Sequence, residues 1–298
     1  MDDFRCGYIA LVGRPNVGKS TLLNRILGQK ISITSRRPQT TRHRVLGIKT
    51  LPSAQLIYVD TPGIHDFSGR AMNRHMNRTA SSVLLDVDVV VFLVDGLHWT
   101  ADDELVLQKL AQITCPVILA INKIDLLGNR EELLPRLQGL SEKRSFAQII
   151  PLSASKGDNV AQLEAVIEEL LPPAPPLFPE DQVTDRSVRF LASELIREKL
   201  FRKLGKELPY GLTVAIEQFK SEPGMTHIHA LIWVERKSQK NIVIGKQGRV
   251  LKEVGSDARR DIEELIEGRV NLKLWVKVKE GWADDERALH SLGYRHDE

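Results

Sequence analysis

The stretch Gly13-Arg14-Pro15-Asn16-Val17-Gly18-Lys19-Ser20 decides the fold of the first part of this chain. It fits the pattern G-x-x-x-x-G-K-[ST], and it lies between an apolar run, Tyr8 to Val12, and a segment of helical period, Lys19 to Leu27. Glycines let the backbone wrap closely around a phosphate, so that successive N–H groups face its oxygens at the positive end of the helix. We therefore predict that residues Gly13 to Thr21 bind the phosphates of a nucleotide.

Groups suited to phosphate and metal chemistry lie in this loop and in two later segments. Lys19 is expected to reach the β- and γ-phosphates, and the Ser20 hydroxyl suits Mg²⁺, which prefers oxygen ligands. In Asp60-Thr61-Pro62-Gly63 the carboxylate would hold Mg²⁺ through water, and Gly63 would donate an N–H to the γ-phosphate. One threonine of Gln39-Thr40-Thr41-Arg42 should cap the γ-phosphate, and we favour Thr41 over Thr40. The candidate catalytic residues are Lys19, Thr41, Asp60 and Gly63, and the candidate Mg²⁺ ligands are Ser20, Thr41 and Asp60.

The base of the nucleotide is indicated by Asn122-Lys123-Ile124-Asp125, which directly follows an apolar run. The Asp125 carboxylate can accept hydrogen bonds from both the ring N–H and the exocyclic amine of guanine, a pair that adenine cannot supply. A backbone N–H of Ser153-Ala154-Ser155, after the last predicted strand, could meet the guanine oxygen. Guanine is therefore the predicted base, and these residues complete the predicted nucleotide site.

Apolar runs in the first 171 residues indicate one α/β domain, because short β-rich runs alternate with longer segments of helical period around a mainly parallel sheet. The predicted strands are Tyr8 to Val12, Val45 to Thr50, Gln55 to Asp60, Val87 to Asp95, Val117 to Asn122 and Ile149 to Leu152. The predicted helices are Lys19 to Leu27, Arg70 to Leu85, Asp102 to Gln112, Glu131 to Gln138 and Val160 to Leu171.

Five prolines between Leu171 and Glu180 exclude a helix or a central strand, so residues 172–184 are predicted to form a semi-rigid linker before a second domain, 185–298. That domain should have the order α-β-β-α-α-β. Its predicted elements are a helix from Ser187 to Leu204 with Asp185 as a cap, strands Leu212 to Phe219 and His227 to Val234, a short helix ending at Ile244, a longer helix to Glu267, and a strand Val270 to Val278. Trp233 and Trp275 lie in these strands and are expected in the core rather than on a stacking surface.

A second glycine-rich turn, Ile244-Gly245-Lys246-Gln247-Gly248-Arg249, joins the last two predicted helices. It lies in the segment from Arg236 to Arg260, which holds eight basic and two acidic residues. Its glycines permit close approach to a phosphate backbone, and the cations of Lys246 and Arg249 add direct contacts. The turn, its flanking helices and the element order resemble a type II KH domain, which implies binding of single-stranded RNA by residues 244–249.

Composition sets outer limits on the function. The chain has 298 residues, of which 42% are hydrophobic and 27% charged, and this excludes a disordered or low-complexity chain. The net charge of +3 does not by itself indicate a nucleic-acid partner. We expect neither a signal peptide nor a membrane-spanning segment, because the start is acidic and the apolar runs are short. Cys6 and Cys115 have no metal or redox spacing and are expected to be reduced thiols.

The nucleotide motifs, in this order, resemble the translation-factor-related class of small GTPases, and Gly13 to Ser20 with Asp60 to Gly63 is similar to its ribosome-assembly branch. That resemblance implies a P-loop GTPase domain over 1–171, with two switch segments, Ser32 to Arg44 and Thr61 to Arg78. A phosphate-loop GTPase joined to one KH domain, ending in the run Trp275 to Leu289, resembles the Era family of bacterial ribosome-assembly GTPases.

The Era resemblance implies a partner and a location. It implies binding to the 3′ end of 16S ribosomal RNA and action in maturation of the 30S subunit, by a monomeric cytoplasmic protein with some peripheral contact at the inner face of the cell membrane. No lipidation signal or amphipathic anchor in the sequence supports the membrane contact.

One departure from Ras-like GTPases follows Gly63. Ile64 stands where a glutamine would orient the attacking water, so slow intrinsic hydrolysis of GTP is expected. The resemblance implies a compensation in which Asn16 helps to hold K⁺, against the alternative of an ordinary loop-stabilising hydrogen bond. Two other functions stay open at this point: a signalling GTPase whose second domain binds a protein or a membrane surface, and a structural GTP binder that does not hydrolyse GTP.

Overall fold

The computed structural model describes residues 4–35, 40–64, 71–96, 98–128, 133–204, 211–285 and 289. The chain divides into two compact units, the first made of Met1–Phe67 with Met76–Asp185 and the second of Ser68–His75 with Arg186–Glu298. Predicted features outside the described residues are Gln39, Arg70, Glu131, parts of both switch segments and part of the run Trp275 to Leu289. No helix among the described residues is long and apolar enough to cross a membrane.

A six-stranded sheet with the order β2-β3-β1-β4-β5-β6 forms the centre of the first unit. Only β2 runs antiparallel to its neighbour, so the predicted, mainly parallel α/β sheet is confirmed. The strands are β1 (Arg5–Val12), β2 (Val45–Thr50), β3 (Ala54–Asp60), β4 (Val89–Asp95), β5 (Val117–Asn122) and β6 (Gln148–Pro151). The helices are α1 (Lys19–Leu27), α2 (Ala71–Ser82), α3 (Ala101–Leu110), α4 (Leu133–Ser141) and α5 (Val160–Leu170).

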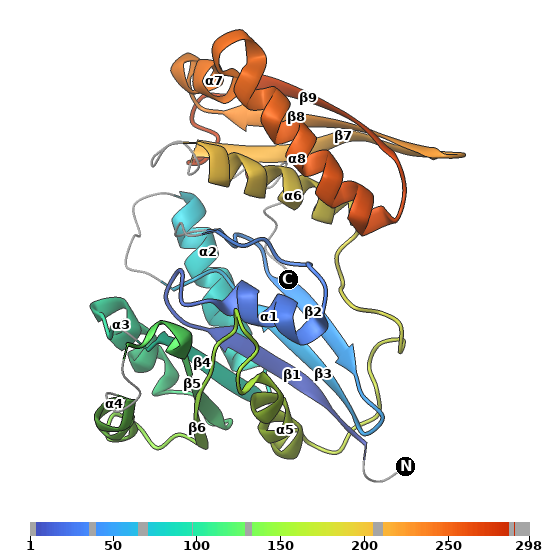
Figure 1. The fold of residues 1–298 in the computed structure, drawn as a ribbon. Coiled ribbons are helices and arrows are strands. Elements are labelled where there is room, and N and C mark those ends of the chain that lie inside the picture. Colours follow the sequence, from blue (N-terminus) through green and yellow to red (C-terminus); the bar gives the residue numbers. More distant parts are fainter. Residues whose placement is uncertain are drawn as a thin grey trace. The chain divides into compact units, whose positions relative to one another are not determined.

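Helices cover both faces of this sheet, α1 and α5 on one side and α3 and α4 on the other (Figure 1). Alternation along the strands explains this arrangement, because successive side chains point to opposite faces. Ala10 and Val12 of β1 belong to the core on the α3 and α4 side, whereas Ile9 and Leu11 are fully buried outside that cluster. The carboxyl ends of β1, β3, β4 and β5 therefore meet at one edge, where a doubly covered parallel sheet carries its ligand site.

The proline-rich segment after α5 is extended, and it is hydrogen-bonded to the first unit along its length. Cys6 N donates to Pro172 O at 3.2 Å, and Ile48 N donates to Val183 O at 2.8 Å. The fully buried side chain of Gln55 bonds to backbone atoms of Leu177 and Phe178. Because of these contacts, the segment is held beside the sheet of the first unit and is not a freely flexible linker.

The second unit has the predicted order of elements. Its strands β7 (Leu212–Glu222), β8 (Met225–Val234) and β9 (Val270–Val278) form one sheet in sequence order, with β7 antiparallel and β9 parallel to β8. Its helices are α6 (Val188–Lys203), α7 (Lys237–Ile244) and α8 (Arg249–Ile266). Figure 1 shows α6 and α8 over one face of the sheet, and their apolar residues share one core with the strands.

Two predictions for this unit are wrong. The cap of α6 is Ser187, whose hydroxyl accepts a hydrogen bond from Phe190 N at 3.2 Å, whereas the Asp185 carboxylate accepts from Leu46 N in the first unit. Neither Trp233 nor Trp275 is in the core, because Trp275 stays 44% exposed and Trp233 is partly exposed outside the core cluster. The alternating pattern of the strand does not show which face of the sheet the helices cover, and only one face is covered.

Candidate functional site

The phosphate loop follows β1, and α1 begins at Lys19. Gly13, Asn16 and Gly18 have φ angles of 151°, 66° and 107°, so the loop depends on left-handed backbone that glycine adopts without strain. A Cβ added at Gly18 would lie 2.2 Å from Asn122 Nδ2, and this contact excludes any larger residue there. The loop is therefore already folded into a concave ring of backbone amides.

The Lys19 ammonium closes this ring. Its Nζ donates to Gly13 O at 2.9 Å and to Arg14 O at 3.1 Å, and the residue is only 6% exposed. Burial lowers the pKa of Lys19 to about 8, although the nearby Asp60 carboxylate opposes that shift. A buried ammonium held by two carbonyls is ready to exchange one of them for a phosphate oxygen.

The three candidate Mg²⁺ ligands converge beside Lys19. Ser20 Oγ lies 2.8 Å from Thr41 Oγ1 and donates to Asp60 Oδ2 at 2.7 Å. Burial raises the pKa of Asp60, while Lys19 and hydrogen bonds from Ser20 and Ser32 act in the opposite direction. Asp60 Oδ1 is buried without a hydrogen-bond partner. Two hydroxyls and a carboxylate with a spare oxygen fit Mg²⁺, which takes oxygen ligands and keeps several waters.

The predicted base site lies across the loop from this cluster. Asn122 Nδ2 donates to Val17 O at 2.7 Å, and Asn122 Oδ1 accepts from Ala154 N at 2.9 Å, so one amide ties the phosphate loop to the Ser153–Ser155 segment. Asp125 Oδ1 is buried without a partner. Since a buried, unpaired carboxylate oxygen is costly, it fits an acceptor that awaits the N–H groups of a base.

Most of these groups line one cavity of about 490 Å³. The predicted residues that line it are Pro15, Asn16, Gly18, Lys19, Ser20, Thr21, Thr41, Gly63, Asn122, Lys123, Asp125, Ala154 and Ser155. Those that do not line it are Gly13, Arg14, Val17, Asp60, Thr61, Pro62 and Ser153. Thr61, for example, donates its hydroxyl to Leu11 O inside the core.

Four lining residues were not named as site residues: Ile33, Thr34 and Ser35, which lie in the predicted switch segment Ser32 to Arg44, and Leu126, which lies outside every predicted segment. Leu126 is 60% exposed, which is unusual for a large apolar side chain beside a polar motif. Its position directly after Asp125 was the available signal. Ile64 is 1% exposed and belongs to the core, so it cannot position a water by hydrogen bonding.

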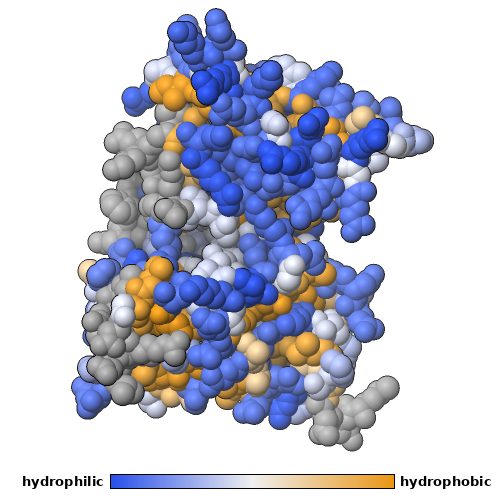
Figure 2. Space-filling model, viewed as in Figure 1, coloured by the Kyte–Doolittle hydropathy of each residue, from blue (hydrophilic) through white to orange (hydrophobic). Residues whose placement is uncertain are grey.

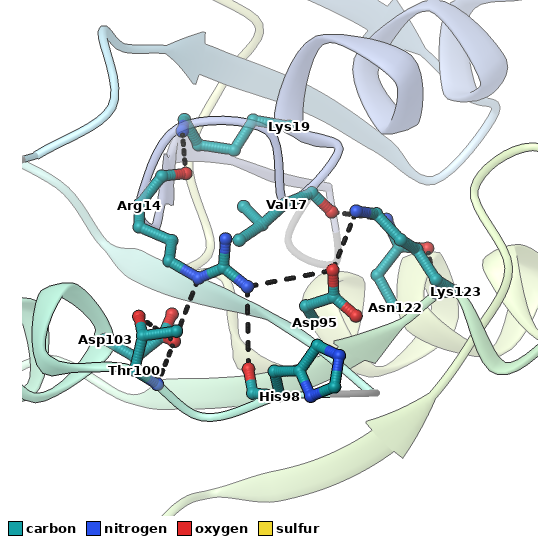
Figure 3. A network of polar contacts seen from close by, with 9 residues as sticks. All are labelled: Arg14, Val17, Lys19, Asp95, His98, Thr100, Asp103, Asn122 and Lys123. Carbon is teal, nitrogen blue, oxygen red and sulfur yellow. Dashed lines mark hydrogen bonds and ion pairs between the residues drawn. The ribbon is translucent and has the colours of Figure 1, made fainter. Parts of the chain in front are cut away.

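The Arg14 side chain extends toward Asp103 and Asp95 (Figure 3), and it does not line the cavity. Its guanidinium lies 3.0 Å from Asp103 Oδ2 and 3.7 Å from Asp95 Oδ2, and Asp95 also pairs with Lys123 Nζ at 2.8 Å. Only the Arg14 backbone faces Lys19. Arg14 thus anchors the phosphate loop to β4 and α3, and neither aspartate belongs to a motif that the sequence singles out.

The glycine turn of the second unit lies at its surface. The backbone bends at three residues with positive φ: Gly245 (φ 72°, ψ 172°), Gln247 (φ 53°) and Gly248 (φ 76°). Lys246 and Gln247 are exposed to solvent in this turn. A Cβ on Gly245 would lie 2.5 Å from Val250 Cγ2. The turn therefore presents the start of α8, with the exposed Arg249, to an outside ligand.

A groove of about 500 Å³ adjoins this turn, between α8 and β9. It is lined by Gly248, Leu251, Lys252, Gly255, Ser256, Arg259, Leu272 and Leu274. Apolar side chains form its floor and two cations flank it, while most side chains on the visible side of α8 are hydrophilic (Figure 2). Of the predicted RNA-binding residues only Gly248 lines the groove. The helical spacing of 248, 252, 255 and 259 was a signal for the lining residues on α8, but not for Leu272 and Leu274 of β9.

Among the described residues, no group of three or more His, Cys, Asp or Glu side chains could hold a metal ion. The cluster of Ser20, Thr41 and Asp60 is of a different kind, because two of its three side chains are hydroxyls.

Comparison with known proteins agrees with both units. The model of the 50S ribosome-binding GTPase family matches residues 8–123, and that of the KH domain matches residues 207–283. The chain is therefore a phosphate-loop GTPase joined to a KH domain.

Relatives over the full length define it further. The chain is 59% identical over 290 residues to GTPase Era of Ectopseudomonas mendocina, covering 97% of both chains, and 59% identical to GTPase Era of Yersinia pestis, covering 98% of this chain and 97% of that one. The crystal structure of Era in complex with MgGDPNP and nucleotides 1506–1542 of 16S ribosomal RNA has a TM-score of 0.95 at 40% identity, covering 98% of this chain and all of that one. A variant of Aquifex aeolicus Era bound to GDP·AlF4⁻ has the same score and identity over the same shares. The chain belongs to the Era family of GTPases.

Proposed function

We propose that the chain binds GTP and GDP with Mg²⁺, hydrolyses GTP slowly, and uses its KH domain to bind the 3′ end of 16S ribosomal RNA during assembly of the 30S subunit. The observation that carries the nucleotide part is the cluster of Ser20, Thr41 and Asp60 oxygens, linked by contacts of 2.8 and 2.7 Å beside the Lys19 ammonium. The relative of known structure that holds both MgGDPNP and 16S nucleotides supports the RNA part.

Each residue has a distinct part in this proposal. Lys19 contacts the β- and γ-phosphates, and the Gly63 N–H donates to the γ-phosphate. Ser20, Thr41 and Asp60 hold the Mg²⁺, which when bound neutralises charge on the phosphates. Asn122, Asp125 and the Ala154 N–H hold guanine.

Hydrolysis without a glutamine is the open step, because Ile64 is buried in the core. We propose that K⁺ held with the help of Asn16, an exposed residue that lines the cavity, stabilises charge on the phosphates. Phosphate release measured in K⁺ and in Na⁺, for the chain and for Asn16→Ala, tests this. Faster release in K⁺ that Asn16→Ala abolishes is expected, equal rates in both salts contradict the K⁺ role, and no release in either salt makes the chain a GTP binder without hydrolysis.

RNA binding is proposed at the groove of Leu251, Arg259 and Leu274 together with the turn 244–249. Apolar side chains accept unstacked bases there, and Lys246, Lys252 and Arg259 contact phosphates.

Arg259 and Arg260 are a matched pair for testing the groove. Arg259 lines the groove, whereas Arg260 pairs with Asp257 outside it. Arg259→Gln should weaken binding of a 16S 3′-end RNA about tenfold, and Arg260→Gln should leave it nearly unchanged. Equal effects would contradict the groove, and intact RNA binding with loss of a protein contact would favour a signalling GTPase. Repeating the measurement with a GTP analogue and with GDP shows whether the two domains are coupled.

The family resemblance also supports a cytoplasmic monomer with peripheral contact to the cell membrane as part of this proposal. Sedimentation of the full chain checks the monomeric state, and sedimentation with vesicles of anionic lipid checks the membrane contact.

A further inference from the structure

The sheet of the second unit has a second face, on the side opposite the groove. Leu272 and Leu274 of β9 line the groove, so the alternate residues Lys273, Trp275 and Lys277 point to the other side. In the parallel pairing of β8 with β9, His229 lies opposite Lys273, Leu231 opposite Trp275, and Trp233 opposite Lys277. Strand β9 thus contributes side chains to both the groove and the opposite face of the sheet, and no side chain belongs to both.

Aromatic rings gather on this second face. Trp275 is 44% exposed and Trp233 is partly exposed, at diagonal positions on neighbouring strands. The His229 ring meets the Trp275 ring edge to face, with centroids 5.2 Å apart and an interplanar angle of 76°. We call Trp233, Trp275 and His229 the tryptophan platform. The contact with His229 holds the Trp275 ring in place, and 44% of Trp275 stays exposed to a partner.

Positive charge surrounds the platform. Lys277 Nζ and Lys279 Nζ lie 6.0 and 5.9 Å from the centroid of the Trp233 ring, and Lys273 is exposed beside His229. None of these three lysines forms an ion pair in the part of the chain that the structure describes. Lys220 on the same sheet differs, because its ammonium is paired with Glu222 at 2.8 Å. Among the described lysines of β7 and β9, those without an ion pair therefore lie beside the platform.

We propose that the tryptophan platform, with Lys273, Lys277 and Lys279, is a second binding surface for single-stranded RNA. Every base has a flat face that stacks on an indole, and a phosphate follows each base at the distance that flanking lysines can reach. An apolar protein partner would leave three lysines to be desolvated without a counter-charge. An acidic protein would pair with the lysines, but it would make no use of the exposed Trp275 ring.

The partner class rests on the proposed function, since both surfaces take RNA, but the platform uses none of the groove residues. The occupant that we propose is the part of the bound RNA strand that leaves the groove. The two surfaces can therefore be inactivated separately, and the failure of one does not imply the failure of the other.

The test uses the full chain carrying Lys252→Gln and Arg259→Gln, which weaken RNA binding in the groove. The probe is a labelled oligouridylate of about ten nucleotides, a length within the roughly 4–16 nucleotides that such surfaces cover. Residual binding that quenches tryptophan fluorescence is expected. Adding Trp275→Ala should weaken it about tenfold, and Trp275→Phe, which keeps a ring, should weaken it much less. Thermal melting shows whether each variant is folded.

Salt dependence supplies the second readout. Adding Lys273→Gln and Lys277→Gln should reduce the slope of log affinity against log salt by about 1.4, since each lost phosphate contact on a single strand contributes about 0.7. Lys220→Gln is the matched control and should change neither affinity nor slope. The proposal is overturned if the groove variant shows no residual RNA binding, or if Trp275→Ala binds RNA as well as Lys220→Gln does. It is also overturned if oligoglutamate competes for the site and Trp275→Ala leaves that competition unchanged. That last result would indicate an acidic protein partner.

Discussion

Arg14 Nε lies 3.0 Å from Asp103 Oδ2, and this pair joins the phosphate loop to the start of α3 (Figure 3). Asp103 is fully buried, and the same Oδ2 accepts hydrogen bonds from Thr100 N at 2.9 Å and Thr100 Oγ1 at 2.8 Å. One carboxylate oxygen therefore caps a helix and anchors the loop that would hold the nucleotide phosphates. The stability of α3 and the shape of the phosphate loop depend on each other through it.

Asp103→Ala is expected to cost about 3 kcal/mol of unfolding free energy, because it leaves the Arg14 guanidinium without its closest partner. The loop loses its anchor, so GDP release should become faster, on the order of tenfold. Stopped-flow release of a fluorescent GDP and thermal melting of the nucleotide-free chain measure the two effects.

Thr100→Ala is the control for this prediction. It removes one hydrogen bond of the cap, worth about 1 kcal/mol, and leaves the Arg14 pair with Asp103 intact. GDP release should then stay close to that of the unchanged chain. If both variants release GDP equally fast, Asp103 acts only through helix stability and the anchoring role is wrong.

Asp125→Asn should exchange the base preference of the nucleotide site. The asparagine amide cannot accept both guanine N–H groups, but it can donate to the carbonyl that xanthine carries in place of the exocyclic amine. Affinity for GDP should fall about a hundredfold, and xanthosine diphosphate should bind better than it does to the unchanged chain. Competition binding with both nucleotides measures this, and an unchanged ratio would place the base elsewhere.

The pKa of Lys19 predicts a pH dependence of nucleotide binding. In the free chain burial lowers that pKa to about 8, so the ammonium loses its proton as the pH rises through 8. A bound phosphate favours the charged form and raises the pKa, so binding takes up a proton above this pH. GDP affinity should be flat below about pH 7.5 and should fall by up to about tenfold per pH unit above pH 8.

Calorimetry in two buffers of different ionisation enthalpy reports this proton uptake directly. About half a proton per GDP is expected at pH 8. Lys19→Arg keeps its charge throughout this range and should show no uptake at whatever affinity remains. Equal uptake in both proteins would assign the proton to another group.

The sequence predicts features that depend on neighbours along the chain, and it fails for features that depend on distant contacts. Helix α1 begins and ends as predicted, because the phosphate loop fixes its start and Gly28, with φ 69°, ends it. The Arg14 contact with Asp103 spans 89 positions and needs the packing of α3 against the sheet. Leu272 and Leu274 could not be assigned to a groove without knowing which face of β9 meets α8. The exposure of Trp275 could not be predicted for the same reason, because it also depends on which face of β9 meets α8.

The final prediction compares alanine substitutions at Gly245 and Gly248. Both glycines have a positive φ, but the space around them differs. A Cβ at Gly245 would overlap Val250, and the backbone there, φ 72° and ψ 172°, is adopted almost only by glycine. A Cβ at Gly248 meets nothing within 4 Å. Gly245→Ala should therefore destabilise the second unit by about 3 kcal/mol, and Gly248→Ala by about 1 kcal/mol.

Hydrogen exchange of the amides of β8 and β9 reports the stability of this unit separately from the first. RNA affinity should follow a different order from stability. Gly248 lines the groove, so an added methyl group there stands where the phosphate backbone approaches, and Gly248→Ala should weaken RNA binding more than its stability cost alone explains. RNA binding that falls only in proportion to stability in both variants would mean that the turn serves the fold and not the ligand.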